Sequence, residues 1–410
     1  MIGLIIKTTL KTTLKRTLII IICVLFVILP CELVFTDELA EDEPIVEIFT
    51  RSSAESTAAT PKIEAGAAVV MDMKSGRILY NKNAYARKSI ASTTKIMTAI
   101  IAIENGNLED KVKVSKRAAS IWGSTIKLRA GEELSLRELL YGVMLKSGND
   151  AAIAVAEHIG GTVENFVSMM NEKAKQLGLK NTAFVTPHGL DEEGHYSTAA
   201  ELAEITRYAL KNPVFSKIVG TQSMAIKDRS LNTTNEMLSL YKGADGVKTG
   251  YTGKAGRCLV TSATRNNFRI ISVVLNCSSR ATRAQSSKAI LDYCFDNYKP
   301  FRIIEKDQEI AKIEVKKGIK RYVRVAAMEE LEMPLTLEER ENLVKEIEVF
   351  DVLNAPVYKD IETGCIKFSV DGKVIAQTAV KTSEDIPVKG FTDYWSEIIN
   401  IWYRLMKTNS

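Results

Sequence analysis

Histidine and cysteine, which most often bind metals or build disulfide frameworks, are scarce in this chain of 410 residues. It has three histidines, and its six cysteines are scattered without a CxxC pair or zinc-ligand spacing. An excess of one charge is also missing, because 55 basic residues face 50 acidic ones. These shortages argue against a zinc protein, a disulfide scaffold and a nucleic-acid-binding protein. We expect buried free thiols, with a single disulfide as the alternative.

Long apolar runs are lacking as well. The apolar stretch at residues 18–29 follows four basic residues, the last being Lys15 and Arg16. A basic segment before about a dozen apolar residues predicts a secretory signal peptide over residues 1–30, so we expect a protein exported across the cytoplasmic membrane. The stretch is shorter than the roughly 20 residues of a spanning helix. No small-x-small cleavage site follows Pro30, so an uncleaved N-terminal anchor is the alternative.

The rest of the chain divides by its pattern of apolar residues. Residues 31–62 are acidic and then rich in Ser, Thr and Ala, which predicts a linker. Residues 67–80 read as a β-hairpin, and a helical period starts at Ser92. Further helical patterns at 134–144, 150–159, 163–177 and 198–210 are followed by two strands, 257–264 and 268–276, and a last helix at 281–298. Strands that flank a helical insert predict an α+β domain over residues 63–298.

After Pro300 the pattern changes to short strands, which predicts a small β domain over residues 299–389. The expected strands are 309–315, 322–327, 347–352, 365–370 and 374–380.

The last segment, residues 390–410, has the spacing of an amphipathic helix. Two of the three tryptophans, Trp395 and Trp402, lie on its apolar face, and charged residues such as Asp393 and Lys407 lie opposite. Aromatic enrichment of this kind favours a helix in the membrane interface, at the outer face of the cell membrane. Docking of the helix on its own protein is the alternative.

Ser92-Thr93-Thr94-Lys95 is the first of three motifs that bear on chemistry. In a helix, residues i and i+3 share a face, so the Lys95 amine can approach the Ser92 hydroxyl. A serine needs such a base to become a nucleophile, and a lysine can serve only with a lowered pKa. The SxxK pattern occurs three times, also at Ser124/Lys127 and Ser239/Lys242. Ser92 stands out because it opens a strongly apolar helix.

The second and third motifs are Ser147-Gly148-Asn149, between two predicted helices, and Lys248-Thr249-Gly250. Lysine with a hydroxyl suits a carboxylate, and the glycine lets the backbone approach a ligand closely. Each motif alone is weak, since turn formers explain the second equally well.

Together and in this order, the three motifs resemble those of penicillin-binding proteins and β-lactamases. The stretches 127–132, 146–152, 186–190 and 195–199 resemble the low-molecular-weight D-alanyl-D-alanine carboxypeptidases among them. The resemblance implies a penicillin-binding/β-lactamase-like transpeptidase domain, an antiparallel sheet with a helical subdomain, followed by a small all-β domain. It also implies a serine-type carboxypeptidase that trims peptidoglycan pentapeptides and is acylated by β-lactams.

The same resemblance implies a role for each residue of the first two motifs. Ser92 attacks the carbonyl between the two terminal D-alanines, and Lys95 accepts its proton. Ser147 relays a proton to the leaving D-alanine, and Asn149 orients Lys95 and the substrate amide. No metal or organic cofactor is needed.

The substrate-binding groups that the resemblance implies lie further along the chain. Lys248 and Thr249, with Gly250, receive the terminal carboxylate, and the N–H groups of Ser92 and Tyr251 form the oxyanion hole. Arg283 is the candidate for a further carboxylate ligand, with Arg280 close by.

Three alternatives stay open. A β-lactamase of the same fold would need a loop glutamate, for which Glu192 and Glu193 lack the surrounding pattern. A non-catalytic wall-binding protein would have lost a motif residue. His188 and His195 could suggest a catalytic triad, but with a lysine base in place we expect them to anchor turns and loops. Transpeptidase and endopeptidase activities, which use the same residues, also stay open, as do vegetative and sporulation roles.

Overall fold

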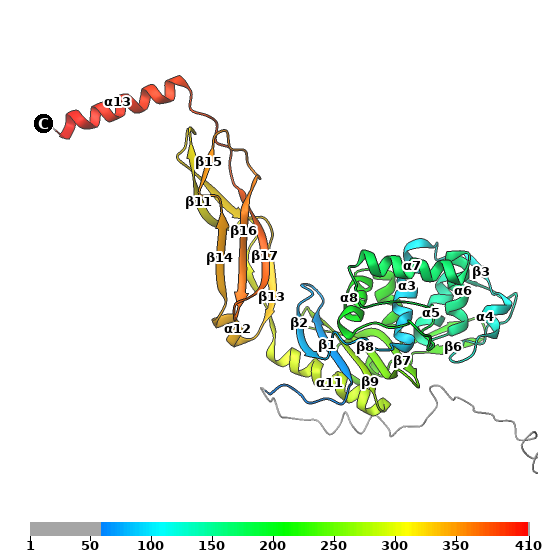
Figure 1. The fold of residues 1–410 in the computed structure, drawn as a ribbon. Coiled ribbons are helices and arrows are strands. Elements are labelled where there is room, and N and C mark those ends of the chain that lie inside the picture. The colour runs from blue at the N-terminus through cyan, green and yellow to red at the C-terminus, as the bar shows by residue number, and fades with distance from the viewer. Residues whose placement is uncertain (1–58, 409–410) are drawn as a thin grey trace, which may run out of the picture. The chain divides into compact units, whose positions relative to one another are not determined.

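The computed structural model describes residues 59–408, so the predicted signal peptide and nearly all of the predicted linker lie outside the described residues. A five-stranded antiparallel sheet of order β2-β1-β9-β8-β7 forms the centre of the first domain (Figure 1). Its strands are β1 (Ala67–Asp72), β2 (Ile78–Lys82), β7 (Ala244–Thr252), β8 (Gly256–Arg265) and β9 (Phe268–Cys277). This confirms the predicted α+β class.

Both faces of this sheet are covered. Neighbouring residues of β1 point to opposite faces, and Val69 and Val70 are both fully buried in different apolar clusters. Helix α8 packs on one face and α11 contributes to the cluster on the other. The sheet therefore separates two cores, and β7 lies at its edge.

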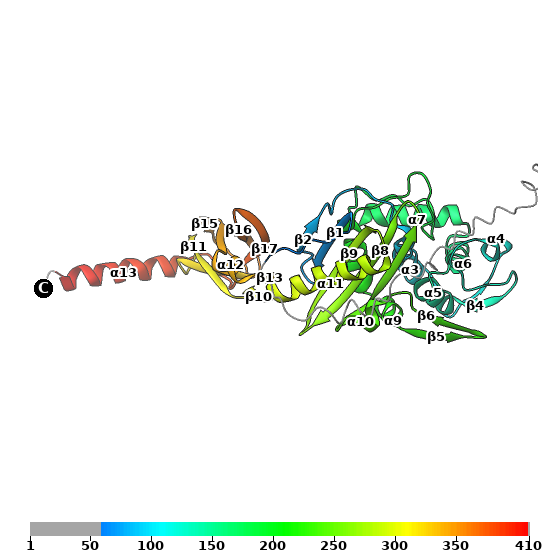
Figure 2. The same ribbon diagram turned by 90° about the horizontal axis from the view of Figure 1, so that it is seen from below.

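Most helices are grouped to one side of the sheet (Figure 2). They are η1 (Ala91–Thr94), α3 (Lys95–Asn105), α4 (Lys116–Ser120), α5 (Leu136–Leu145), α6 (Asn149–Gly160), α7 (Val163–Gln176), α8 (Ala199–Leu210), α9 (Pro213–Val219), α10 (Met237–Leu240) and α11 (Arg280–Asn297). Two small hairpins accompany them: β3 (Lys111–Lys113) with β4 (Glu133–Ser135), and β5 (Ser223–Ile226) with β6 (Arg229–Asn232).

Side-chain caps set several helix starts. Ser135 and Glu138 form a capping box at α5, and the Thr198 hydroxyl accepts the N–H of Glu201 at α8. The helix predicted from Ser92 begins instead with the 3₁₀ turn η1, and Ser92 caps neither element. Its hydroxyl is therefore available for another partner.

The C-terminal domain is a six-stranded sheet of order β14-β16-β17-β12-β11-β15 with a separate β10–β13 pair. The elements are β10 (Lys299–Ile304), β11 (Glu309–Lys316), β12 (Tyr322–Ala327), β13 (Leu331–Leu335), α12 (Leu337–Glu341), β14 (Val344–Val349), β15 (Val352–Asn354), β16 (Glu362–Val370) and β17 (Lys373–Thr382). The single strand expected at 347–352 is wrong: two strands meet there, separated by exposed Phe350 and Asp351. An all-β domain is confirmed.

Arg77 in the β1–β2 turn connects the two domains. Its guanidinium binds the Glu339 carboxylate on α12, with Nη1 and Oε2 3.0 Å apart, and both side chains are largely buried. The same Arg77 donates to the carbonyl of Pro334. The sequence predicted a hairpin turn here, but it did not predict that this turn contacts the second domain.

The last element is α13 (Phe391–Thr408), whose side chains are exposed along residues 391–407. Among residues 59–408, no helix combines the length and the apolar character that crossing a bilayer requires.

Candidate active site

Ser92 and Lys95 meet where η1 continues into α3. The Lys95 amine lies 2.9 Å from the Ser92 hydroxyl oxygen, as the i, i+3 spacing predicted. Ser92 is partly exposed, whereas Lys95 is fully buried. A reachable hydroxyl thus lies against an amine that solvent does not reach.

Two further groups hold the Lys95 amine. It donates to Oδ1 of Asn149 and to the carbonyl oxygen of His188, both at 2.7 Å. Both oxygens can only accept hydrogen bonds. They orient the amine toward Ser92 from two elements distant in sequence.

Ser147 lies in the short connection between α5 and α6. It is fully buried, and its hydroxyl oxygen has no hydrogen-bond partner among the described residues. Its backbone is left-handed, with φ of +60°, as is that of Ala91, with φ of +46°, directly before Ser92. Such strain in non-glycine residues is typical of functional sites, where the surrounding structure maintains it.

Asn149 connects Lys95 to the loop before α5. Its Nδ2 donates to the carbonyl of Trp122 at 2.8 Å, and its backbone N–H donates to the carbonyl of Ser124 at 2.7 Å. Ser124 therefore supports the site through its backbone, while the third SxxK serine, Ser239, is exposed on α10 and donates to the Glu236 carbonyl. Ser124 thus contacts Asn149 through its backbone, whereas in the pair Ser92/Lys95 the lysine amine donates to the Asn149 side chain.

Asp150 was not predicted from the sequence. Its buried carboxylate accepts backbone N–H groups from Ile126 and Leu128, at 3.0 to 3.1 Å, and from Ala151, at 2.8 Å. It ties the loop that carries Trp122 to the start of α6. Its position directly after Asn149 was the only signal for it.

The third motif lies on β7, a strand that the sequence pattern did not predict. It comprises Lys248, Thr249 and Gly250. A Cβ atom on Gly250 would lie 3.0 Å from the backbone nitrogen of Ser92 and 3.1 Å from that of Thr93. The glycine therefore allows the strand to approach η1. This approach brings the third motif to the nucleophile.

The polar groups of this strand are held closely. Lys248 is buried and its amine donates to the Thr249 carbonyl at 2.8 Å. The Thr249 hydroxyl lies 2.6 Å from that of Thr234, a residue the sequence did not single out. Tyr251, next on the strand, has the Arg257 guanidinium 3.9 Å from its ring centre.

Arg283, the predicted further carboxylate ligand, is already bound to a side chain of the protein. Its guanidinium donates to both carboxylate oxygens of Glu236, at 2.6 and 2.7 Å, and the residue is only 3% exposed. The geometry gives no support to Arg283 as an open carboxylate ligand, because a carboxylate of the protein already occupies it. Sequence reasoning missed this partner, which lies 47 positions earlier.

Both histidines that were expected to anchor loops are buried, and their rings accept hydrogen bonds from backbone N–H groups. His195 accepts the N–H of Val185 on Nδ1, so its Nε2 donates to the Thr94 hydroxyl at 2.8 Å. His188 accepts the N–H of Leu190 on Nδ1. Burial lowers the pKa of His195 to about 4 and the pKa of His188 to about 3. Both rings are neutral at physiological pH.

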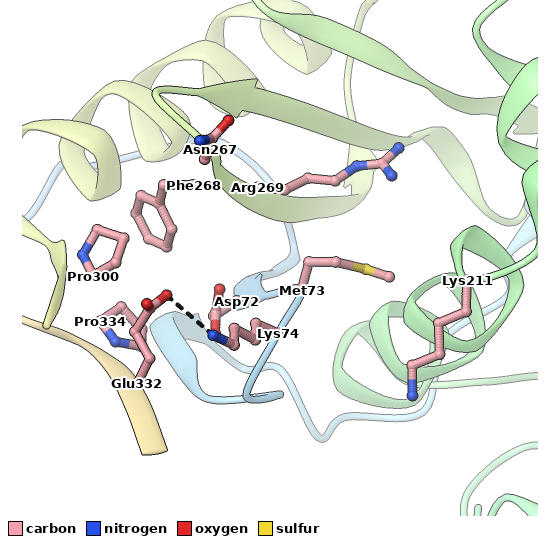
Figure 3. A pocket seen from close by; sticks show the side chains of 10 residues that line it. All are labelled: Asp72, Met73, Lys74, Lys211, Asn267, Phe268, Arg269, Pro300, Glu332 and Pro334. Carbon is pink, nitrogen blue, oxygen red and sulfur yellow. Dashed lines mark ion pairs between the residues drawn. The ribbon is translucent and has the colours of Figure 1, made fainter. Parts of the chain in front are cut away.

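A separate cavity of about 400 Å³ lies where the first domain meets β10 and β13 (Figure 3). Phe268 and the ion pair of Lys74 with Glu332, 3.5 Å apart, line it. None of the predicted site residues lines this cavity, so it is distinct from the site around Ser92.

Comparison with known sequences decides the family. The profile described as D-alanyl-D-alanine carboxypeptidase matches residues 54–279, and that of the penicillin-binding protein 5 C-terminal domain matches residues 298–388. The chain belongs to the D-alanyl-D-alanine carboxypeptidase family. This confirms the resemblance that the three motifs indicated, and it makes the chain a serine peptidase of the hydrolase class.

Individual relatives of known sequence align with most of the chain. D-alanyl-D-alanine carboxypeptidase DacF of Bacillus subtilis is 39% identical, over 83% of this chain and 90% of the relative. DacA of Haemophilus influenzae is 34% identical, over 83% and 90%. The crystal structure of penicillin binding protein 5 from Haemophilus influenzae superposes with a TM-score of 0.73 at 33% identity, covering 81% of this chain and all of that one.

Proposed function

We propose that this carboxypeptidase removes the terminal D-alanine from peptidoglycan pentapeptides through an acyl-enzyme on Ser92. The observation that carries this is the 2.9 Å contact between the Ser92 hydroxyl and a buried Lys95 amine. Family membership supports the substrate class.

The partners of Lys95 favour its role as the base. A neutral amine has two N–H donors and one lone pair. The Asn149 amide oxygen and the His188 carbonyl accept two donors, so the lone pair faces the Ser92 hydroxyl, which can donate. Complete burial favours the neutral amine, because loss of solvent penalises charge.

The acyl transfer then follows. The Ser92 oxygen bonds to the carbonyl carbon of the penultimate D-alanine, and its proton passes to Lys95. The carbon–nitrogen bond breaks, and the leaving amine receives the proton by way of Lys95 and Ser147, whose hydroxyl has no other partner among the described residues. Water hydrolyses the ester and restores Ser92.

Two sets of donors complete the site. The N–H groups of Ser92 and Tyr251 stabilise the oxyanion, a role that the close approach of Gly250 to the Ser92 nitrogen supports. Lys248 and Thr249 receive the terminal carboxylate, since an ammonium and a hydroxyl are both suitable donors. Arg283 remains ion-paired with Glu236.

The same serine would be acylated by β-lactams, as covalent inhibitors rather than substrates. Slow release of penicillin would favour the carboxypeptidase, and rapid turnover would favour a β-lactamase. The physiological role is peptidoglycan maturation in cell-wall or spore-wall biogenesis.

We place the enzyme at the outer face of the cytoplasmic membrane, bound peripherally by α13. The exposure of this helix supports the interfacial role over docking on the protein itself: Phe391 is 81% and Trp402 68% exposed.

Mass spectrometry of a pentapeptide incubated with the enzyme and with Ser92→Ala tests the reaction. We expect loss of one alanine with the wild type and none with the variant. Release that persists in Ser92→Ala, or none in the wild type, would overturn the assignment. Ser239→Ala, which changes an exposed serine of another SxxK pair, is the matched control and should retain activity.

A further inference from the structure

Thr234, between β6 and α10, contacts the group that the proposed function assigns to the substrate carboxylate. Its hydroxyl oxygen lies 2.6 Å from that of Thr249. Thr234 is partly exposed, so it borders the site rather than the core. No motif of the sequence includes it.

The chemistry of a carboxylate sets the direction of this hydrogen bond. An ionised carboxylate only accepts, so Thr249 must use its single hydroxyl hydrogen on it. The Thr249 oxygen can still accept a bond, which Thr234 then donates. If Thr249 instead donated its hydroxyl hydrogen to Thr234, only the lone pairs of the Thr249 oxygen would face the carboxylate. A donating Thr234 thus selects the productive orientation of Thr249, and the chained hydroxyls polarise one another.

The segment Thr234–Asn235–Glu236 is held from several sides. The Thr234 N–H donates to the carbonyl of Leu145 at the end of α5, at 3.0 Å. Asn235 accepts the N–H of Met237 at 3.2 Å, and Glu236 binds Arg283 on α11. The backbone that carries the Thr234 hydroxyl is therefore held in place.

Two buried polar atoms without a hydrogen bond to any described residue lie on the segments next to Thr234 and Leu145. In the described part of the chain, two buried side-chain polar atoms lack a hydrogen-bond partner, Ser147 Oγ and Asn235 Nδ2. Asn235 follows Thr234 directly, and Ser147 lies just beyond Leu145, to which Thr234 is bonded. Buried polar groups are normally paired, so unpaired side chains on the two described segments that this backbone bond joins are consistent with a polar ligand there.

We propose that Thr234 is a positioning residue for carboxylate recognition, because it donates to Thr249 and directs that hydroxyl at the C-terminal carboxylate of the peptide. This rests on the proposed function and deepens it. This role for Thr234 explains how the site can recognise the peptide carboxylate although Arg283 is paired with Glu236.

Binding in the Ser92→Ala background tests this without turnover. The Kd of a pentapeptide ending in D-alanyl-D-alanine is compared with that of its C-terminal carboxamide by calorimetry. We expect Thr234→Val to weaken binding of the free acid about tenfold and to change binding of the carboxamide much less, because a hydrogen bond to charge is lost only for the acid. Thr234→Ser keeps the hydroxyl and should restore the affinity.

Turnover gives a second readout. In the active enzyme, Thr234→Val should raise KM with little change in kcat, because Ser92 and Lys95 are untouched. Thr206→Val, which removes a buried hydroxyl on α8 bonded to the Leu202 carbonyl, is the control for loss of a threonine elsewhere. Unchanged affinity in Thr234→Val, or equal loss for acid and carboxamide, overturns the inference. A wild type that binds the acid but releases no D-alanine would instead overturn the proposed function.

Discussion

At the scale of single residues, the site combines groups that usually destabilise a fold. Lys95 is a fully buried amine, Ser147 and Ala91 have left-handed backbones, and the Ser147 hydroxyl has no partner among the described residues. The neutral, buried rings of His188 and His195 accept backbone N–H groups of Leu190 and Val185 and so hold the adjoining backbone in place. The surrounding hydrogen bonds therefore maintain an arrangement that local preferences oppose.

The two histidines make stability depend on pH. Both pKa values fall from 6.5 on folding, to about 3 for His188 and about 4 for His195. Below pH 6.5 the unfolded chain takes up protons that the folded protein does not, so stability is full above this pH and is lost as the pH falls toward 4 and 3. Between pH 7 and pH 5 we expect a loss of about 2 kcal/mol per histidine.

Urea unfolding at both pH values measures this loss. His195→Gln should reduce it by about one histidine's share, roughly 2 kcal/mol. His158→Gln, which changes the remaining histidine on α6, is the matched control. Equal losses in His195→Gln and wild type would contradict the expectation.

At the scale of elements, the site forms where three segments converge. The η1–α3 junction provides Ser92 and Lys95, the α5–α6 connection provides Ser147 and Asn149, and β7 provides Lys248 and its neighbours. The convergence depends on the close approach of β7 to η1 at Gly250.

Gly250→Ala tests that approach. The new Cβ would lie 3.0 Å from the Ser92 nitrogen, so the strand must move away from the nucleophile. Because a misplacement of about 1 Å costs roughly 100-fold in rate, we expect this smaller displacement to lower turnover a few-fold, with little effect on stability. Gly253→Ala is the matched control, because no atom lies within 4 Å of its Cβ position. D-alanine release at equal rates in the two variants would show that the spacing does not matter.

At the scale of the whole molecule, the proposed catalytic groups and the proposed membrane-binding helix lie in different parts of the chain. The proposed catalytic groups lie between Ser92 and Tyr251, and the exposed apolar side chains of α13 lie in the last element. The proposed attachment can therefore be tested separately from the proposed chemistry.

Vesicle co-sedimentation checks the attachment. We expect the double variant Trp395→Ser/Trp402→Ser to lose most of its binding to anionic vesicles while it releases D-alanine at the wild-type rate, since interfacial binding depends on buried apolar area. Trp122→Ser is the matched control for binding, because Trp122 is similarly exposed, at 60%, but lies outside the helix. Equal sedimentation of all three proteins would exclude α13 as the anchor.

Much of the fold and site could be read from the sequence, because the signals are local. The i, i+3 spacing predicted the Ser92–Lys95 contact, and apolar periods predicted α6, α7 and α8 within a residue or two of their bounds. The order of the three motifs indicated the family. Each of these follows from neighbours along the chain.

Tertiary structure alone decided the rest. The pairing of Arg283 with Glu236, the contact of Thr249 with Thr234 and the loop that Asp150 holds join residues 15 to 47 positions apart. Strand register and helix packing determine which of these side chains meet, and neither is encoded by local spacing. The sequence by itself thus determined the family motifs and the groups proposed to carry the chemistry, because both follow from local spacing and order. The packing of α10, α11 and β7 decided which of these groups already bind another side chain of the protein, as Arg283 binds Glu236.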